Sequence, residues 1–241
     1  TNLEDTSPVY PNYPVAFDPD TVVNVPSGSG YFVGQPATTT LGDEWRGCVG
    51  SREGGLNVGD SGYTGSKVEV VLNTNHCPSP IQPLTDNRQT LLDAVAALVP
   101  NGATYIPAGL VWGHRVVSEN APFTGGVPYS DVDEGKAKKV IVLMTDGKNT
   151  RSKTPNHHVH EVNTNNSEAD SVTLQACDAI KDDKISLYTI SFGTSVPVPT
   201  IDMLRACATS FDNYYNAEGA QQLSNVFEAI VKENSKFFLS N

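Results

Sequence analysis

The chain has 241 residues, of which 38% are hydrophobic and 18% are charged, and its formal net charge is −11. This length suits one large domain, and the acidic balance argues against nucleic acid or an anionic membrane surface as a direct partner. No run of about 18 apolar residues is present, so the sequence contains no candidate transmembrane helix. The chain begins with Thr1 rather than Met, and we therefore expect a processed or truncated piece of a longer protein.

Residues 1–66 differ in composition from the remainder of the chain. They contain stretches such as "SPVYPNYP" and "GSREGGLNVGDSG", which are rich in turn formers and have only short apolar runs. The sequence therefore predicts a long loop-rich N-terminal insertion with a few edge strands at 1–66, followed by a regular domain at 67–241.

From residue 67 onward, strand and helix patterns alternate. Two of the strands, "KKVIVLMTD" and "ISLYTISF", are apolar on both faces, which is typical of a parallel sheet covered by helices. The sequence thus predicts an α/β fold with a mostly parallel sheet. The expected elements are, in chain order, a strand at 67–73, helices at 85–99 and 104–118, a strand at 138–146, a helix at 168–183, a strand at 185–192, a helix at 199–209, a strand at 213–217 and a helix at 219–236.

Asp146 follows the apolar strand at 138–146 directly. In open α/β sheets, ligands bind outside the carboxyl ends of the strands, and Asp146 occupies such an end. We interpret it as a candidate binding residue; the alternative is an aspartate that only stabilises a turn or caps a helix.

The four cysteines are Cys48, Cys77, Cys177 and Cys207, and none forms a C-x-x-C pair. A zinc ribbon or a thioredoxin-type site is therefore not expected. Of the three possible pairings, we favour Cys48 with Cys77 and Cys177 with Cys207, since each pair shares one region of the chain. The alternative is four reduced cysteines in a cytosolic protein; an even number of cysteines in a loop-rich chain favours an oxidising compartment.

The histidines give a second candidate metal site. His157, His158 and His160 lie close together beside Glu161, and imidazole groups bind Zn, Cu and Ni. A solvated loop is the preferred interpretation. His114 lies next to Trp112 on a predicted helix, where we expect a surface or half-buried residue rather than a ligand.

No nucleophile motif such as G-x-S-x-G is present, and we expect binding rather than catalysis. The catalytic alternative is a metal-dependent hydrolase that uses His157, His158 and His160.

The chain resembles a von Willebrand factor A (vWA) domain in four stretches, which are, in order, "NGATYIPAGLVWG", "KKVIVLMTDG", "ISLYTISF" and "MLRACATS". More narrowly, the chain resembles the TadG-type proteins of bacterial tight-adherence (Flp) pilus systems, over about residues 44–240. The resemblance implies a doubly wound, mostly parallel sheet flanked by helices.

The vWA family also implies a metal-ion-dependent adhesion site (MIDAS), built from a D-x-S-x-S loop, a threonine and an aspartate. Thr104 matches the threonine and Asp146 the aspartate, and the implied cofactor is Mg²⁺ or Ca²⁺. The D-x-S-x-S motif is missing; the nearest stretches are "DSGYTGS" at 60–66 and "DPDT" at 18–21, and we expect neither to replace it. We expect the first strand of the domain to be missing from this chain.

The resemblance implies an extracytoplasmic protein-binding module of a pilus-assembly or adhesion protein. Its partners would be pilus or envelope proteins in the periplasm or at the bacterial cell surface, and the longer parent protein would be anchored in the membrane. A cell-surface adhesin that recognises host or matrix ligands is the alternative within binding.

Overall fold

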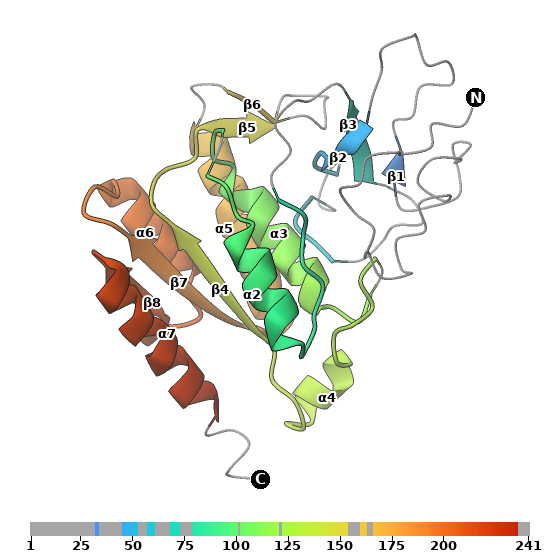
Figure 1. The fold of residues 1–241 in the computed structure, drawn as a ribbon, viewed down its shortest axis with the longest axis vertical. Helices are drawn as coiled ribbons and strands as arrows, with labels where there is room; N and C mark the ends of the chain where they lie inside the picture. Colours follow the sequence, from blue (N-terminus) through green and yellow to red (C-terminus); the bar gives the residue numbers. More distant parts are fainter. Residues whose placement is uncertain are drawn as a thin grey trace.

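A computed structural model of the chain describes residues 32–33, 45–52, 57–60, 68–72, 79–100, 102–120, 122–153, 160–162 and 166–235. Its main sheet contains strands β4 (Val140–Thr145), β7 (Ser186–Phe192) and β8 (Tyr214–Ala217), in the order β4-β7-β8. Both strand pairs are parallel (Figure 1). The predicted α/β class with a parallel sheet is therefore confirmed.

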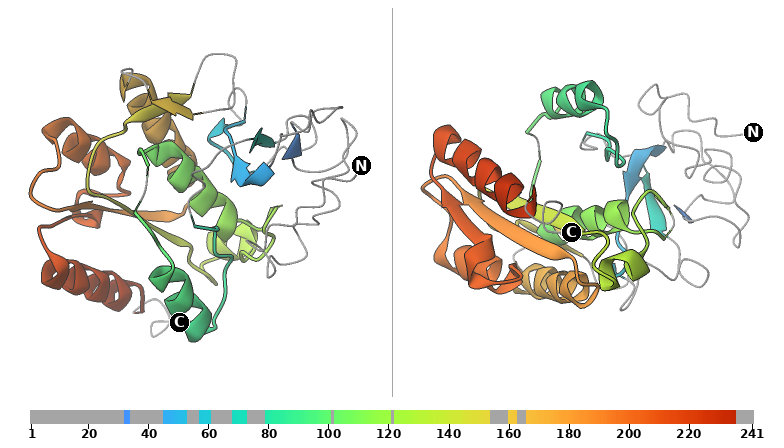
Figure 2. Two further views of the ribbon diagram at one scale, coloured as in Figure 1. Left: turned by 45° about the horizontal axis from the view of Figure 1, so that its top comes forward. Right: turned by 90° about the horizontal axis from the view of Figure 1, so that it is seen from below.

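Helices cover the sheet on both faces. Figure 2 shows α5 (Asn166–Asp182) and α6 (Val198–Cys207) on one side and α7 (Ala220–Ser235) on the other. The helix α3 (Ile106–Val117) packs on α5 and reaches β4. On the side of α3, α5 and α6, the buried cluster consists of Leu110, Val111, Ile141, Ala176, Cys177, Ile180, Ile185, Leu187 and Cys207, and on the side of α7 it consists of Tyr188, Ile190, Ala217, Val226 and Ile230.

The central strand β7 explains why these layers form. Its residues from Leu187 to Ser191 are all buried, and successive side chains point to opposite faces. Leu187 consequently joins the cluster beneath α3, α5 and α6, while Tyr188 and Ile190 join the cluster beneath α7. The predicted boundaries of the strands and helices around this core agree with the structure to within a few residues.

The disulfide between Cys177 and Cys207 connects α5 to α6 beside this core. The predicted pairing of these two cysteines is confirmed. The other predicted pair includes Cys77, which lies outside the described residues. A protein disulfide is typical of an oxidising compartment.

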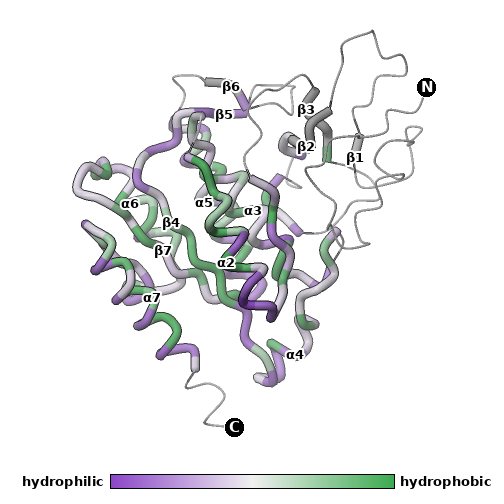
Figure 3. The backbone as a smooth tube through the Cα atoms, in the orientation of Figure 1, coloured by the Kyte–Doolittle hydropathy of each residue, from purple (hydrophilic) through white to green (hydrophobic). Residues whose placement is uncertain are grey.

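The outer edge of β4 has no strand beside it among the residues that the structure describes. On the face turned towards α7, Val140 and Val142 are only half buried and Met144 is 47% exposed. Figure 3 shows that β4 is nonetheless among the most apolar segments of the sheet. β4 is thus an apolar strand that is covered on one edge only.

Helix α2 (Arg88–Ala96) stands apart from the sheet (Figure 2). None of its residues is buried; Leu91 is 42% exposed and Val95 is 66% exposed. The helix forms where the sequence predicts one, and Asn87 caps it by accepting a hydrogen bond from the backbone N–H of Thr90. Its apolar side has no partner among the described residues that would bury it.

The N-terminal part contributes a small second sheet, in the order β1-β3-β2. β1 (Phe32–Val33) is parallel and β2 (Trp45–Val49) antiparallel to β3 (Val68–Leu72). β3 is the strand predicted at 67–73, and its partners in the described chain come from residues before 67 rather than from the main sheet.

Four short elements were not predicted. The strands β5 (Arg151–Lys153) and β6 (His160–Val162) form an antiparallel hairpin, α4 (Tyr129–Asp133) is a short helix, and a 3₁₀ turn lies at Phe211–Asn213. Among the residues that the structure describes, no helix is both long and apolar enough to cross a bilayer.

Candidate functional site

The structure brings together the two segments that carry the predicted site residues Thr104 and Asp146. The Thr104 carbonyl accepts backbone hydrogen bonds from Thr150 at 2.9 Å and Arg151 at 3.0 Å. The Thr104 N–H donates to Thr150 Oγ1 at 2.7 Å. The loop before α3 therefore lies against the segment that follows Asp146, and the exposed Asp146 sits at the carboxyl end of β4. We call the loop ends that carry Thr104 and Asp146 the rim.

Asn149 holds the rim together and was missed by the sequence analysis. Its side chain is fully buried; Oδ1 accepts a hydrogen bond from the Ile106 N–H at 2.7 Å, at the start of α3. Nδ2 donates to Asp170 Oδ1 at 2.8 Å and to Thr173 Oγ1 at 3.5 Å, both on α5. One side chain thus caps α3, which would otherwise begin with an unsatisfied N–H group, and ties it to α5.

The rim provides only part of a cation site. A threonine hydroxyl and a carboxylate are oxygen ligands of the kind that Mg²⁺ accepts, but an octahedral ion needs more ligands than these two residues offer. Asp60, which begins the stretch closest to D-x-S-x-S, lies elsewhere in the fold, as shown below.

Of the three histidines proposed as a second metal site, only His160 lies in the described part of the chain, in β6. Its Nε2 is 2.6 Å from the Ser51 hydroxyl, and its ring lies 4.1 Å from the ring of Tyr105. Burial raises the pKa of Tyr105 to about 12. His160 is thus half buried in a contact between the N-terminal part and the main domain rather than in a solvated loop; His157 and His158 lie outside the described residues.

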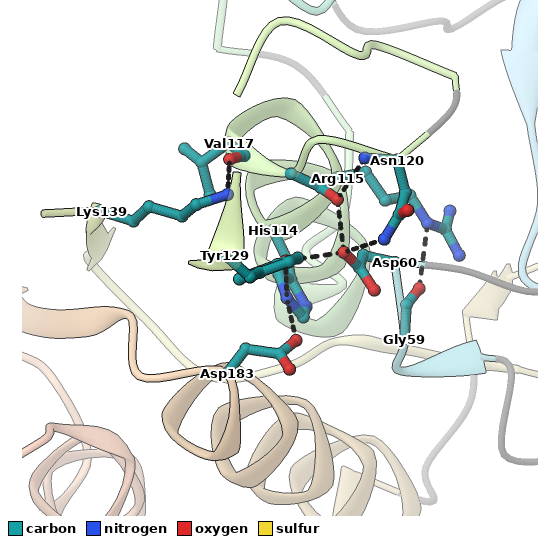
Figure 4. Close-up of polar contacts among 10 residues, drawn as sticks. Gly59, Asp60, His114, Arg115, Val117, Asn120, Tyr129, Lys139 and Asp183 are labelled. Carbon is teal, nitrogen blue, oxygen red and sulfur yellow. Dashed lines mark hydrogen bonds and ion pairs between the residues drawn. The ribbon is translucent and has the colours of Figure 1, made fainter. Parts of the chain in front are cut away.

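A different group of residues is arranged so that it can hold a metal ion: Asp60, His114 and Asp183 (Figure 4). One ligand atom of each lies within 4.8 Å of the others, and His114 Nε2 is 2.9 Å from Asp183 Oδ2. Asp60 comes from the N-terminal part, His114 from α3, and Asp183 from the turn between α5 and β7. We call these three residues the Asp–His–Asp cluster.

Hydrogen bonds fix the Asp60 carboxylate in the cluster. Its Oδ2 accepts from the Ser118 hydroxyl, from Asn120 Nδ2 at 3.2 Å and from the Tyr129 hydroxyl at 2.7 Å. Burial works to raise the pKa of Asp60, but the hydrogen bonds from Ser118 and Tyr129 and the charge of His114 outweigh it, and the pKa lies below its ordinary value. Asp60 is therefore a buried but ionised carboxylate.

His114 and Asp183 share the other half of the cluster. His114 is 1% exposed, and burial lowers its pKa below the ordinary value, although Asp60 and Asp183 both act to raise it. Burial raises the pKa of Asp183, although His114 acts to lower it. The imidazole is consequently neutral near pH 7. The expectation that His114 is a surface or half-buried residue was wrong, because the residue is almost fully buried.

Lys139 supplies positive charge beside the cluster. Its Nζ donates to the Val117 carbonyl at 2.8 Å and lies 3.8 Å from the centre of the Tyr129 ring. Burial lowers the pKa of Lys139, although Glu119, Asp60 and Asp183 act to raise it.

The Asp–His–Asp cluster and the rim lie at opposite ends of the main sheet. Asp183 precedes β7, whereas Asp146 follows β4, and the two strands are parallel. A strand of this length spans about 20 Å. Asp60 therefore cannot supply the ligands that the rim lacks. The remainder of "DSGYTGS", residues 61–66, lies outside the described residues.

Gly126 shapes the loop that brings Tyr129 to Asp60, and we expect Gly126→Ala to destabilise the protein strongly. A Cβ at this position would lie 2.0 Å from the Val117 carbonyl oxygen and 2.4 Å from the Ser118 carbonyl oxygen, so backbone would have to move. The expected cost, measured by urea unfolding, is about 3 kcal/mol, at the upper end of overpacking effects. Gly125→Ala is the matched control, because its nearest contact would be an ordinary 3.5 Å; equal stability of the two variants would contradict the structure here.

Comparisons with known proteins leave the family of this chain open. No family model and no curated protein matches the sequence. Two solved structures of proximal thread matrix protein 1 from the mussel byssus, in two crystal forms, are similar at 20% identity, with TM-scores of 0.37 and 0.40. They match 60% and 64% of this chain, which spans only 28% and 31% of the length of those chains.

Proposed function

We propose that the chain is a vWA-like protein-binding module of an extracytoplasmic pilus-assembly or adhesion protein, and that it binds its partner at the rim rather than catalysing a reaction. The observation that carries this proposal is the contact between the Thr104 loop and the segment after Asp146, at the carboxyl end of a parallel strand. Sheets of this class bind ligands at that end.

The exposed position of Asp146 suits a surface that meets another protein. Thr104 and Asp146 offer a hydroxyl and a carboxylate to a divalent cation, and a carboxylate from the partner would fill a further coordination position. Recognition through a shared cation also suits a chain with a net charge of −11, because the cation reduces the repulsion between two acidic surfaces.

The bare edge of β4 and the exposed apolar side of α2 support the interpretation as an incomplete vWA domain. No strand among the described residues covers the outer edge of β4, and no residue of α2 is buried; both are expected where a further strand of the sheet is missing. Such a strand would end beside Asp146, because parallel strands share their carboxyl edge, and its terminal residues would complete the rim.

The Cys177–Cys207 disulfide supports a place outside the cytoplasm, where such bonds persist. We propose the periplasm or the cell surface of a bacterium as the compartment.

The rim makes a direct prediction for cation binding. Mg²⁺ or Ca²⁺ will raise the midpoint of thermal unfolding, because an ion that binds only the folded state stabilises it by mass action. At ten times the dissociation constant, the gain is about 1.4 kcal/mol, or about 3–6 °C for a domain of this size. Differential scanning fluorimetry with increasing Mg²⁺ and Ca²⁺ measures it.

Asp146→Asn should abolish the shift, since it removes the only carboxylate of the predicted pair. Asp178→Asn is the control: this side chain lies on α5, is 71% exposed and forms an ion pair with Lys181 of the same helix. Asp183→Asn serves as a second control, because it removes a carboxylate of the Asp–His–Asp cluster and leaves the rim unchanged. It therefore shows at which of the two sites the cation binds. A midpoint that does not move with either cation, or that moves equally in Asp146→Asn, would rule out a cation at the rim.

A further inference from the structure

We propose that the Asp–His–Asp cluster binds a divalent transition-metal ion of the Zn²⁺ type and so fastens the segment around Asp60 to the main domain. This site is separate from the rim and does not depend on the proposed function.

The three side chains converge from parts of the chain that are far apart in sequence. Asp60 lies in a segment whose Gly59 carbonyl accepts a hydrogen bond from Arg115 Nε at 3.3 Å, beside His114 on α3. Asp183 follows α5 and is 69 positions from His114. Figure 4 shows the carboxylate of Asp183 and that of Asp60 on two sides of the His114 ring. A metal ion bound here would therefore join three segments of the fold.

The ligand atoms are close enough for a single ion. They lie within 4.8 Å of one another, whereas ligands of a tetrahedral Zn²⁺ at about 2.0–2.1 Å are separated by about 3.4 Å. Small rotations of the Asp183 side chain would close the difference, because this side chain is 38% exposed and is held by a hydrogen bond to His114.

His114 carries a buried polar atom that the protein does not satisfy. Among the residues that the structure describes, Nδ1 has no hydrogen-bond partner, although His114 is almost fully buried. Buried polar groups in proteins nearly always have a partner, so a group without one indicates a bound water molecule or ion nearby. The nitrogen that lies beside the Asp183 carboxylate is Nε2, at 2.9 Å, so a metal bound in the cluster would take the place of this hydrogen bond and Nδ1 would carry the imidazole proton.

The ligand set selects the class of metal. One imidazole nitrogen and two carboxylate oxygens suit Zn²⁺ better than Mg²⁺ or Ca²⁺, which prefer oxygen ligands alone. When both are ionised, the two carboxylates also match the charge of a divalent ion. Three protein ligands leave a fourth position open, and the exposed side of Asp183 gives the ion a path from solvent.

The surroundings provide the support that metal ligands usually have. Metal-binding carboxylates are commonly held by further hydrogen bonds. The Asp60 carboxylate is held in this way by Ser118, Asn120 and Tyr129. The competing interpretation is a purely structural ion pair between His114 and Asp183, in which Nε2–H donates to the carboxylate and no metal is needed.

Isothermal titration calorimetry distinguishes the two interpretations. The full chain is freed of metal with EDTA and titrated with Zn²⁺. We expect one Zn²⁺ per chain for the wild type, and for Asp183→Asn an affinity weaker by about 10-fold or more. Asp182→Asn is the matched control, since it removes the same charge at the exposed neighbouring position and should change the affinity less than about twofold. No binding, or equal binding by the wild type and Asp183→Asn, would overturn the proposal.

A second measurement needs no substitution. Imidazole nitrogen NMR of the wild type follows all five histidines during the Zn²⁺ titration. A shift centred on the His114 ring supports the cluster. Shifts centred instead on His157, His158 and His160, together with loss of binding when these three are changed to alanine, would place the metal at the histidine segment and overturn the proposal.

Discussion

Replacing Cys177 and Cys207 together by alanine will lower the free energy of unfolding by about 3–4 kcal/mol. The disulfide closes a segment with a sequence separation of 30, and losing the cross-link allows the unfolded chain more conformations. Alanine is preferred to serine, because both cysteines are fully buried in the cluster under α3, α5 and α6 and a hydroxyl would add a desolvation cost. Guanidinium unfolding of both proteins measures the difference.

The same double variant also tests the remaining predicted disulfide. Adding reductant to the variant can act only on Cys48 and Cys77. A further loss of stability would support their pairing, and no change would contradict it. A loss below about 1 kcal/mol in the variant itself would show that the α5–α6 connection does not stabilise the domain in the way the entropy argument requires.

Asn149→Ala will cost about 2–3 kcal/mol, because the substitution leaves the buried Ile106 N–H without its acceptor and removes a donor from the half-buried Asp170. The Ile106 N–H loses its acceptor at the start of α3, and Asp170 loses its hydrogen-bond donor on α5. Each unsatisfied buried group costs about 1–3 kcal/mol. Urea unfolding measures the loss, and the cation-dependent shift at the rim should weaken as well, because the loop that carries Thr104 is no longer held in place.

Two further variants make this result specific to Asn149. Asn149→Asp keeps an oxygen for the Ile106 N–H but faces the Asp170 carboxylate with a second negative charge, so it should also be destabilised. Asn225→Ala, at an exposed position on α7, should stay within about 0.5 kcal/mol of the wild type. Equal effects of Asn149→Ala and Asn225→Ala would contradict the structural role of the buried amide.

The sequence predicted best what local patterns determine. The apolar runs that become β4 and β7 are visible in the sequence, and so is the first turn of α3, where Pro107 is tolerated because its missing N–H would have no partner there. Asp146 could be placed at the carboxyl end of a strand for the same reason.

The Asp–His–Asp cluster could not be predicted in this way. His114 and Asp183 are 69 positions apart, and Asp60 lies in a segment whose composition indicates only turns. The burial of His114 results from packing between α3 and α5, which no spacing along α3 reveals. Leu91 and Val95 illustrate a second limit of the sequence. Their spacing correctly predicted a helix, but it could not predict whether another segment buries the apolar side of that helix.

The bare edge of β4 also affects how the purified protein will behave. In the part of the chain that the structure describes, no strand pairs with this edge, and unpaired backbone N–H and C=O groups along an apolar strand act as a template for a strand from another copy. The net charge of −11 keeps copies of the protein apart at low ionic strength. Added salt weakens this repulsion, because the distance over which charges act becomes shorter as the salt concentration rises. Aggregation of the protein should therefore increase with added salt. The opposite is expected of aggregates that are held together by exposed ion pairs.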